Sequence, residues 1–159
     1  MKFYGRRMTD AQHRPCGAAG DLRAATDVVT EFVRDLADGR ARDAATADRR
    51  FAADVAWGSP YGATVHGIDT LLPIHERLHR DGAGGPSSRW EIDRVLPLGD
   101  DVIVTHVRRR ALGPDGEPLP PAEPGAAFSE TMLYVLVRRD GDWWLAAGQN
   151  TPIRPGGAV

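Results

Sequence analysis

Apolar side chains in the first part of the chain recur at helical spacing. Between residues 21 and 38 they stand three and four positions apart, which predicts a helix with one buried face. Gly39 is a favourable residue for ending that helix. A second, shorter helix is predicted over residues 43–54, because Asp43 is a good N-cap residue and Phe51 then points toward the core.

The next segment indicates a short strand pair and then a third helix. Residues 55–57 and 64–66 have strand character, and Pro60 lies in the turn between them. Residues 67–80 then show one apolar face at helical spacing. Pro73 fits this helix only if the helix begins late enough to place the proline in its first turn.

The rest of the chain is extended. Four segments alternate or run apolar at strand length: residues 90–98, 101–112, 127–139 and 142–151. Short turns between neighbours predict antiparallel pairing, so three helices followed by this sheet predict an α+β domain. The proline-rich connection over residues 113–125 is either a stiff solvated loop or a functional element, such as a lid or a dimer contact.

The 159 residues fit a single domain. Residues 1–20 contain arginines but no apolar run, so we expect a flexible tail there, without a signal peptide or membrane span, and a folded domain over residues 21–159.

Charge and cysteine content narrow the class of partner. The formal net charge of −2, with both signs evenly mixed, indicates neither a nucleic-acid partner nor an anionic membrane. Cys16 is the only cysteine, so no internal disulfide can form. These features favour a cytoplasmic protein with a small-molecule or protein partner.

Two stretches carry a resemblance to a known superfamily. They are FAADVAWGSPYGATVHGIDTL, where a strand, a bend and the dipeptide HG lead into the third helix, and the closing RRDGDWWLAAGQNTPI. Over residues 21–154 the chain resembles the nuclear transport factor two-like superfamily, which has the cystatin-like cone fold. Within it, the chain is similar to the SnoaL-like polyketide cyclases and the SgcJ/EcaC-type proteins of enediyne biosynthesis.

The resemblance implies a cone-shaped roll. Three N-terminal helices would pack against a curved, mostly antiparallel sheet around a ligand-sized, mostly apolar cavity. It also implies an accessory protein of polyketide or enediyne biosynthesis that binds a hydrophobic polyene or cyclising intermediate. Such a protein either catalyses a cofactor-free isomerisation, cyclisation or release, or serves as a non-catalytic binding protein or partner of a polyketide synthase.

Ketosteroid isomerase shares this fold and gives one test of chemistry. Its carboxylate base falls on Ser59, its oxyanion-binding tyrosine falls on Phe32, and its protonated aspartic acid falls on Tyr134. Ser59 cannot act as a base without a partner, and Phe32 has no hydrogen-bond donor. Only Tyr134 can still donate a hydrogen bond, so the isomerase mechanism is not expected here.

The cyclase alternative needs a group that exchanges a proton near neutral pH, and histidine is the obvious side chain. His75 lies on the apolar face of the third predicted helix, and His106 lies in mid-strand on the side of Val102 and Val104. We therefore take His75, His106 and Tyr134 as catalytic candidates. A buried, hydrogen-bonded structural histidine is the alternative for either position.

Further residues are candidates for shaping the substrate site, although filling the core or satisfying strand ends explains several of them equally well. They are Trp57, Ser59, Tyr61, Trp90, Glu130, Met132, Gln149 and Asn150. If Glu130 faces inward, it is a further candidate base.

No metal or cofactor is expected. His75 and His79 have the spacing of a metal-binding pair, but no HExxH pattern or third ligand accompanies them. The adjacent Trp143 and Trp144 must face opposite ways on a strand, which favours a homodimer because one of them is left for a partner.

Overall fold

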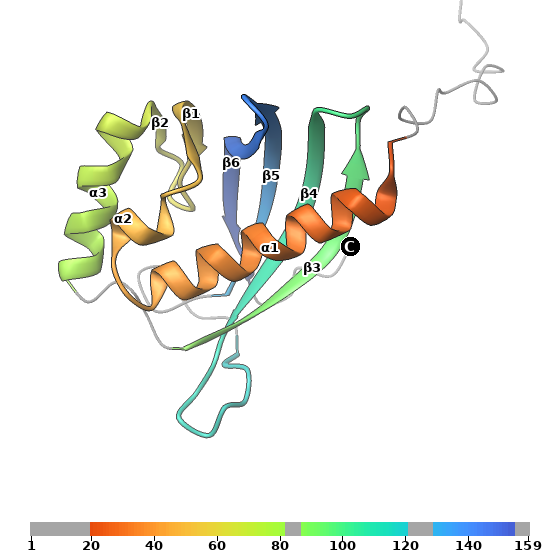
Figure 1. Ribbon diagram of the computed structural model, residues 1–159. Coiled ribbons are helices and arrows are strands. Elements are labelled where there is room, and N and C mark those ends of the chain that lie inside the picture. Colours follow the sequence, from red (N-terminus) through yellow and green to blue (C-terminus); the bar gives the residue numbers. More distant parts are fainter. Residues whose placement is uncertain (1–19, 82–86, 121–128, 155–159) are drawn as a thin grey trace, which may run out of the picture.

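The computed structural model describes residues 20–81, 87–120 and 129–154 (Figure 1). In chain order the elements are α1 (Leu22–Arg40), α2 (Ala44–Ala47), β1 (Phe51–Gly58), β2 (Thr64–His66), α3 (Ile68–Arg80), β3 (Ser88–Pro97), β4 (Val102–Ala111), β5 (Glu130–Arg139) and β6 (Asp142–Pro152). Apart from Gly20, the predicted tail lies outside the described residues, as do residues 121–125 of the proline-rich connection.

The strands form one six-stranded sheet in the order β2-β1-β6-β5-β4-β3. Four of the five pairings are antiparallel, and β1 runs parallel to β6. The sheet curves, and α1 crosses its concave side while α2 and α3 close one end (Figure 1). The predicted α+β class is confirmed, and the sheet is a mixed one of six strands.

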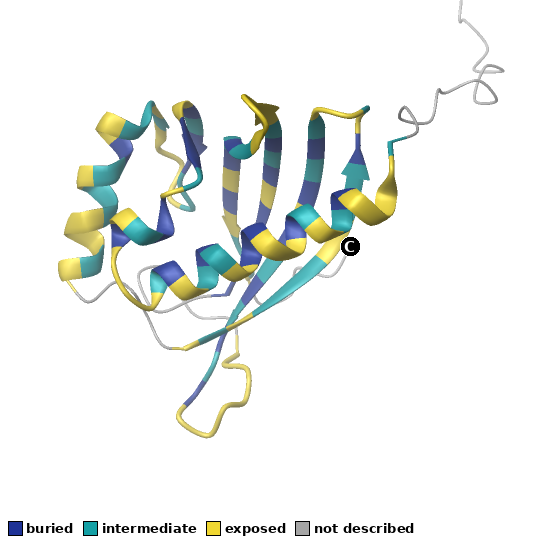
Figure 2. Ribbon diagram, viewed as in Figure 1, coloured by how far each residue is buried: buried dark blue, intermediate teal, exposed yellow. Residues whose placement is uncertain are grey.

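The long helix α1 forms where the apolar spacing predicts it. The carboxylate of Asp21 caps the helix by accepting hydrogen bonds from the backbone N–H groups of Arg23 and Ala24, at 2.9 and 3.1 Å. The buried face of α1 points to the sheet (Figure 2), and it carries Val29 and Phe32 into the core. None of the helices in the described part of the chain is long and apolar enough to cross a membrane.

The prediction of a helix over residues 43–54 is wrong in its second half. The helix α2 ends at Ala47, and Phe51 is already the first residue of β1. There Phe51 pairs in parallel with Leu145 of β6. Pairing with a distant strand therefore outweighs the local helical pattern at this point.

The helix α3 also begins earlier than Pro73 suggests. Gly67 has a φ of 81°, and its N–H donates a hydrogen bond to the Val55 carbonyl at 2.8 Å. The chain therefore turns directly from the strand pair into a helix starting at Ile68. Pro73 lies within the helix rather than in its first turn, with an exposed side chain.

Candidate functional site

The inner face of the sheet is set by the register of its central strands. Tyr134 of β5 lies opposite Thr105 of β4 and opposite Gly148 of β6. Residues directly opposite each other project to the same face, and each second residue along a strand returns to it. Met132, Asn150, Arg109 and Glu130 therefore share this face, and all four are buried.

A carboxylate and an imidazole meet on the helical side of this face. Oδ2 of Asp48, directly after α2, lies 2.7 Å from Nδ1 of His75 in α3. Asp48 is 5% exposed, and His75 is partly buried. The two residues come together because α2 packs against α3.

Aromatic rings connect this pair to the sheet. The His75 ring meets Trp57 edge-on at a centroid distance of 5.4 Å and Phe51 at 6.4 Å. Trp57 in turn stacks on Tyr134, with the ring centroids 6.3 Å apart. Gly148 permits this stack, because a Cβ there would lie 2.9 Å from Trp57 Cζ3.

Tyr134 is 2% exposed, and its environment holds the phenol in its protonated form. Burial raises the pKa of Tyr134 well above its usual range, and the charge of Glu130 raises it further against the opposing effect of Arg40 and Arg109. A phenol that keeps its proton remains a hydrogen-bond donor at neutral pH.

A second charged pair lies two residues along the same face. Arg109 Nε donates a hydrogen bond to Glu130 Oε1 at 2.9 Å, and both side chains are buried. Glu130 therefore faces inward, which is the condition for its role as a base. Its carboxylate, however, is paired with the guanidinium of Arg109. Arg40, the last residue of α1, is partly buried near this pair.

Two of the sequence-predicted residues face the other side of the sheet. His106 alternates with the buried Thr105 and Val107, so it projects to the outer face, where it is exposed. The structure therefore does not bring His106 next to His75. Gln149 likewise pairs with the exposed Leu133 and is itself exposed, whereas its neighbour Asn150 faces inward.

The hairpin residues have local contacts. Ser59 Oγ accepts hydrogen bonds from the N–H groups of Tyr61 and Ala63, at 3.2 and 3.1 Å, which stabilises the turn. Tyr61 is 68% exposed. Trp90 lies opposite Arg109 on the inner face and packs against the core, and Met132 is wholly buried within that core.

Sequence reasoning missed Asp48, Arg40 and Arg109. Asp48 stands in a polar stretch that predicted a helix surface, so nothing in the sequence marked it. Arg109 was detectable, because it continues the alternation of Thr105 and Val107 into a run of arginines. Within the described part of the chain, no group of three or more His, Cys, Asp or Glu side chains is placed to hold a metal ion.

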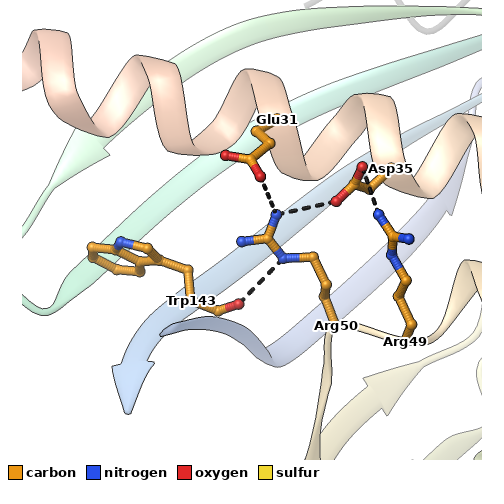
Figure 3. A network of polar contacts seen from close by, with 5 residues as sticks. All are labelled: Glu31, Asp35, Arg49, Arg50 and Trp143. Carbon is orange, nitrogen blue, oxygen red and sulfur yellow. Dashed lines mark hydrogen bonds and ion pairs between the residues drawn. The ribbon is translucent and has the colours of Figure 1, made fainter. Parts of the chain in front are cut away.

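A second polar network lies on the surface between α1 and the sheet (Figure 3). Asp35 binds both Arg49, at 2.8 Å, and Arg50, at 3.2 Å, and Arg50 also contacts Glu31 and the carbonyl oxygen of Trp143. These residues contribute to the lining of a surface pocket of about 270 Å³. Because its charges are balanced among themselves, we regard this network as a clamp between α1, the start of β1 and β6.

Solved structures share this fold at low sequence identity. A cystatin-like domain from Nostoc punctiforme has a TM-score of 0.68 and 19% identity over 82% of this chain and 78% of its own. An NTF2-like protein from Shewanella oneidensis has a TM-score of 0.63 and 13% identity over 79% and 98%, respectively. A ketosteroid isomerase-like protein from Erwinia carotovora has a TM-score of 0.61 and 15% identity over 85% and 98%.

The fold therefore places the chain among the α+β proteins of the cystatin-like, NTF2-like class. The sequence narrows this further, since the SnoaL-like domain family matches residues 29–146. This protein belongs to the SnoaL-like domain family. No curated protein matches its sequence.

Proposed function

We propose that this protein binds a small, largely apolar molecule against the inner face of its sheet and exchanges a proton with it through His75. The contact of His75 Nδ1 with Asp48 Oδ2 at 2.7 Å is the observation that carries the proposal. A carboxylate accepts hydrogen bonds, so Nδ1 carries the hydrogen and Nε2 is left as the proton acceptor. A buried carboxylate that orients an imidazole in this way is a recurring arrangement for general acid–base chemistry.

The surrounding residues fit the same role. His75 and Tyr134 both contact the buried ring of Trp57, which therefore links the imidazole to the phenol. Tyr134 keeps its proton, so it can donate a hydrogen bond to an oxygen that gains charge when a neighbouring carbon is deprotonated. Cofactor-free enolisation followed by cyclisation or isomerisation needs these two functions.

The proposed setting is natural-product biosynthesis in the cytoplasm. Membership in the SnoaL-like family and the resemblance to polyketide cyclases support a polyketide-derived polyene or cyclising intermediate as the ligand. The narrower assignment to enediyne biosynthesis, and a partnership with a polyketide synthase, are proposed on the sequence resemblance alone.

A non-catalytic binding protein is the second candidate. Ser59 stands where ketosteroid isomerase keeps its base, and its oxygen accepts two backbone hydrogen bonds within the hairpin turn. Glu130, the other inward carboxylate considered from the sequence, is paired with Arg109. If His75 exchanges no proton, these observations favour a protein that shields a reactive intermediate.

The test is exchange of the α-protons of 2-tetralone in deuterated buffer, followed by NMR. The wild type should accelerate exchange, and His75→Gln should reduce this acceleration at least tenfold. Asp48→Asn should lose part of it, because the imidazole is no longer oriented. His66→Gln, an exposed histidine on β2, is the matched control and should behave like the wild type.

His106→Gln tests the other histidine that the sequence suggested as catalytic. We expect no change in the exchange rate, because His106 lies on the outer face. Exchange that survives His75→Gln would overturn the acid–base proposal. Exchange lost in His106→Gln would transfer the role to the outer face of the sheet.

We also propose a homodimer formed through this outer face. Leu96, Val104, Val135 and Ala147 lie in one register row across four strands, and all four remain partly exposed. A second copy would cover this apolar row isologously. Sedimentation should give a dimer for the wild type and for Ala53→Arg on β1, and a monomer for Val135→Arg; a monomeric wild type would contradict the proposal.

A further inference from the structure

One charged group inside the described part of the fold has no close ion-pair partner. Two carboxylates are buried among the residues that the structure describes, and each has a partner: Asp48 binds His75 at 2.7 Å, and Glu130 binds Arg109 at 2.9 Å. The charges of Asp48, Glu130 and Arg109 all act on Arg40. Yet Arg40 forms no ion pair within 4.0 Å with any residue that the structure describes.

The position of Arg40 on its helix does not account for its burial. A cation in the last turn interacts favourably with the helix dipole, and Arg40 occupies that turn. This interaction works equally well for an exposed side chain, whereas Arg40 is partly buried. Burial lowers the pKa of the Arg40 guanidinium, and the charge of Arg109 lowers it further, so the folded protein holds a cation at some cost.

A second polar group on the inner face also lacks a partner. Asn150 is 6% exposed, and its Oδ1 has no hydrogen-bond partner among the described residues. Asn150 lies opposite Met132, between the positions of Glu130 and Tyr134 on the neighbouring strand. Both of those residues interact electrostatically with Arg40, so the unsatisfied acceptor and the cation without an ion pair flank the same part of the fold.

We infer that Arg40 binds the carboxylate of a conjugated carboxylic acid, whose hydroxyl or N–H group donates a hydrogen bond to Asn150 Oδ1. The inference names the ligand class for the site of the proposed function and rests on that site. An incoming carboxylate supplies the close ion-pair partner that Arg40 lacks among the described residues, with the bidentate geometry that guanidinium favours. The conjugated part of the acid would lie beside the partly buried His75, which contacts both Asp48 and Trp57 on the same inner side.

4-Hydroxycinnamate and 4-hydroxycinnamamide, written below as cinnamate and cinnamamide, test the inference, because they differ in charge and share the same conjugated body and the phenolic hydroxyl that can donate to Asn150 Oδ1. Each is titrated into the protein while ¹H–¹⁵N NMR spectra are recorded. The wild type should bind cinnamate at least tenfold more tightly than cinnamamide, with shifts at the Arg40 Nε–H and the Asn150 side-chain amide. Direct shifts at these two groups separate a ligand contact from a merely structural role.

Variants at α1 provide the matched comparison. Arg40→Gln should bind the two compounds equally, and Arg40→Lys should recover part of the preference for the anion. Arg34→Gln removes an exposed arginine from the same helix and should keep the full preference. Arg40→Gln that still prefers cinnamate would overturn the inference.

The outcomes also separate this inference from the proposed function. Equal binding of both compounds by the wild type, with shifts on the inner face, would refute anion recognition and leave apolar ligand binding standing. A strong preference for cinnamate without exchange of 2-tetralone protons would support the carboxylate site and refute the catalytic role. Absence of inner-face shifts with both compounds would overturn the inference together with ligand binding at this site.

Discussion

Asp48 and His75 are 27 positions apart in the chain, yet their side chains lie 2.7 Å apart. The contact joins the turn after α2 to the middle of α3 and is nearly closed to solvent on the carboxylate side. It therefore both ties two helices together and selects which imidazole nitrogen carries the hydrogen.

We expect His75 to be the Nδ1–H tautomer in the neutral form. Long-range ¹H–¹⁵N NMR distinguishes the two ring nitrogens directly. Asp48→Asn should give a mixture of tautomers, because an amide can donate as well as accept. It should also lower the free energy of unfolding by about 1–3 kcal/mol, since a buried partner is replaced by a poorer one. A pure Nε2–H form in the wild type would contradict the proposed role of Asp48.

Gly148→Ala should disrupt the stack of Trp57 on Tyr134. The new Cβ would lie 2.9 Å from Trp57 Cζ3 and 3.1 Å from Tyr134 Cδ1, and two stacked rings cannot both move aside. We expect a loss of about 1–3 kcal/mol in stability and a changed near-ultraviolet circular dichroism spectrum. Thr151→Ser, at an exposed position of β6 outside the proposed dimer row, is the control and should leave the spectrum unchanged.

Asp35→Asn should destabilise the protein near neutral pH but not in acid. Burial by itself raises the pKa of Asp35, but hydrogen bonds and charges from Arg49 and Arg50 outweigh burial and lower it (Figure 3). A depressed carboxyl pKa contributes stability that is present above the unfolded value of about 3.9 and is lost as the pH falls below it.

Urea unfolding at pH 7 should show a loss of about 1–2 kcal/mol for Asp35→Asn, and the difference from the wild type should shrink toward pH 3. Asp38→Asn, on an exposed position of the same helix, should show little change at either pH. A difference that persists unchanged in acid would mean that packing, and not charge, explains the effect.

Tyr134 should make the wild type sensitive to alkali. Its pKa is raised in the folded state, so its contribution to stability is complete below the unfolded value of about 10 and falls as the pH rises above that value. The expected slope is about 1.4 kcal/mol per pH unit for this one proton. Tyr134→Phe should unfold with a smaller slope above pH 10, by an amount that approaches this value near pH 11.5, whereas equal slopes would show that the phenol is not shifted.

Arg40→Met should melt at or above the temperature of the wild type in the absence of ligand. The substitution removes a partly buried cation that has no ion pair among the described residues and keeps an unbranched side chain of similar length. Arg109→Met is the contrasting variant, since it leaves Glu130 buried without its partner and should cost about 3–5 kcal/mol. Calorimetry that ranks the two variants in the opposite order would contradict the unequal pairing of these arginines.

Much of the fold was predictable because its causes are local. The apolar spacing of α1 and the alternation in β4, β5 and β6 depend on neighbours within one element, and those elements form close to the predicted residues. Alternation on β5 also predicts that Tyr134, Met132 and Glu130 share one face of the strand.

The errors arose where distant segments compete with local pattern. Phe51 has helical spacing to its neighbours, but parallel pairing with Leu145 places it in β1. His106 was expected at the cavity from its position in a strand, and the register with β5 shows that its side of the strand is the outer one. Alternation relates the residues of a strand to one another but does not say which set is covered by helices.

The sequence by itself therefore determined the α+β class, the family and most element boundaries, because these depend on periodicity and local turn chemistry. Only the tertiary structure decided that Asp48 partners His75, that Glu130 is paired with Arg109 and that Arg40 lacks an ion pair among the described residues. Side-chain pairing across a fold depends on how helices dock on the sheet and on strand register. Neither leaves a periodic signal in the chain.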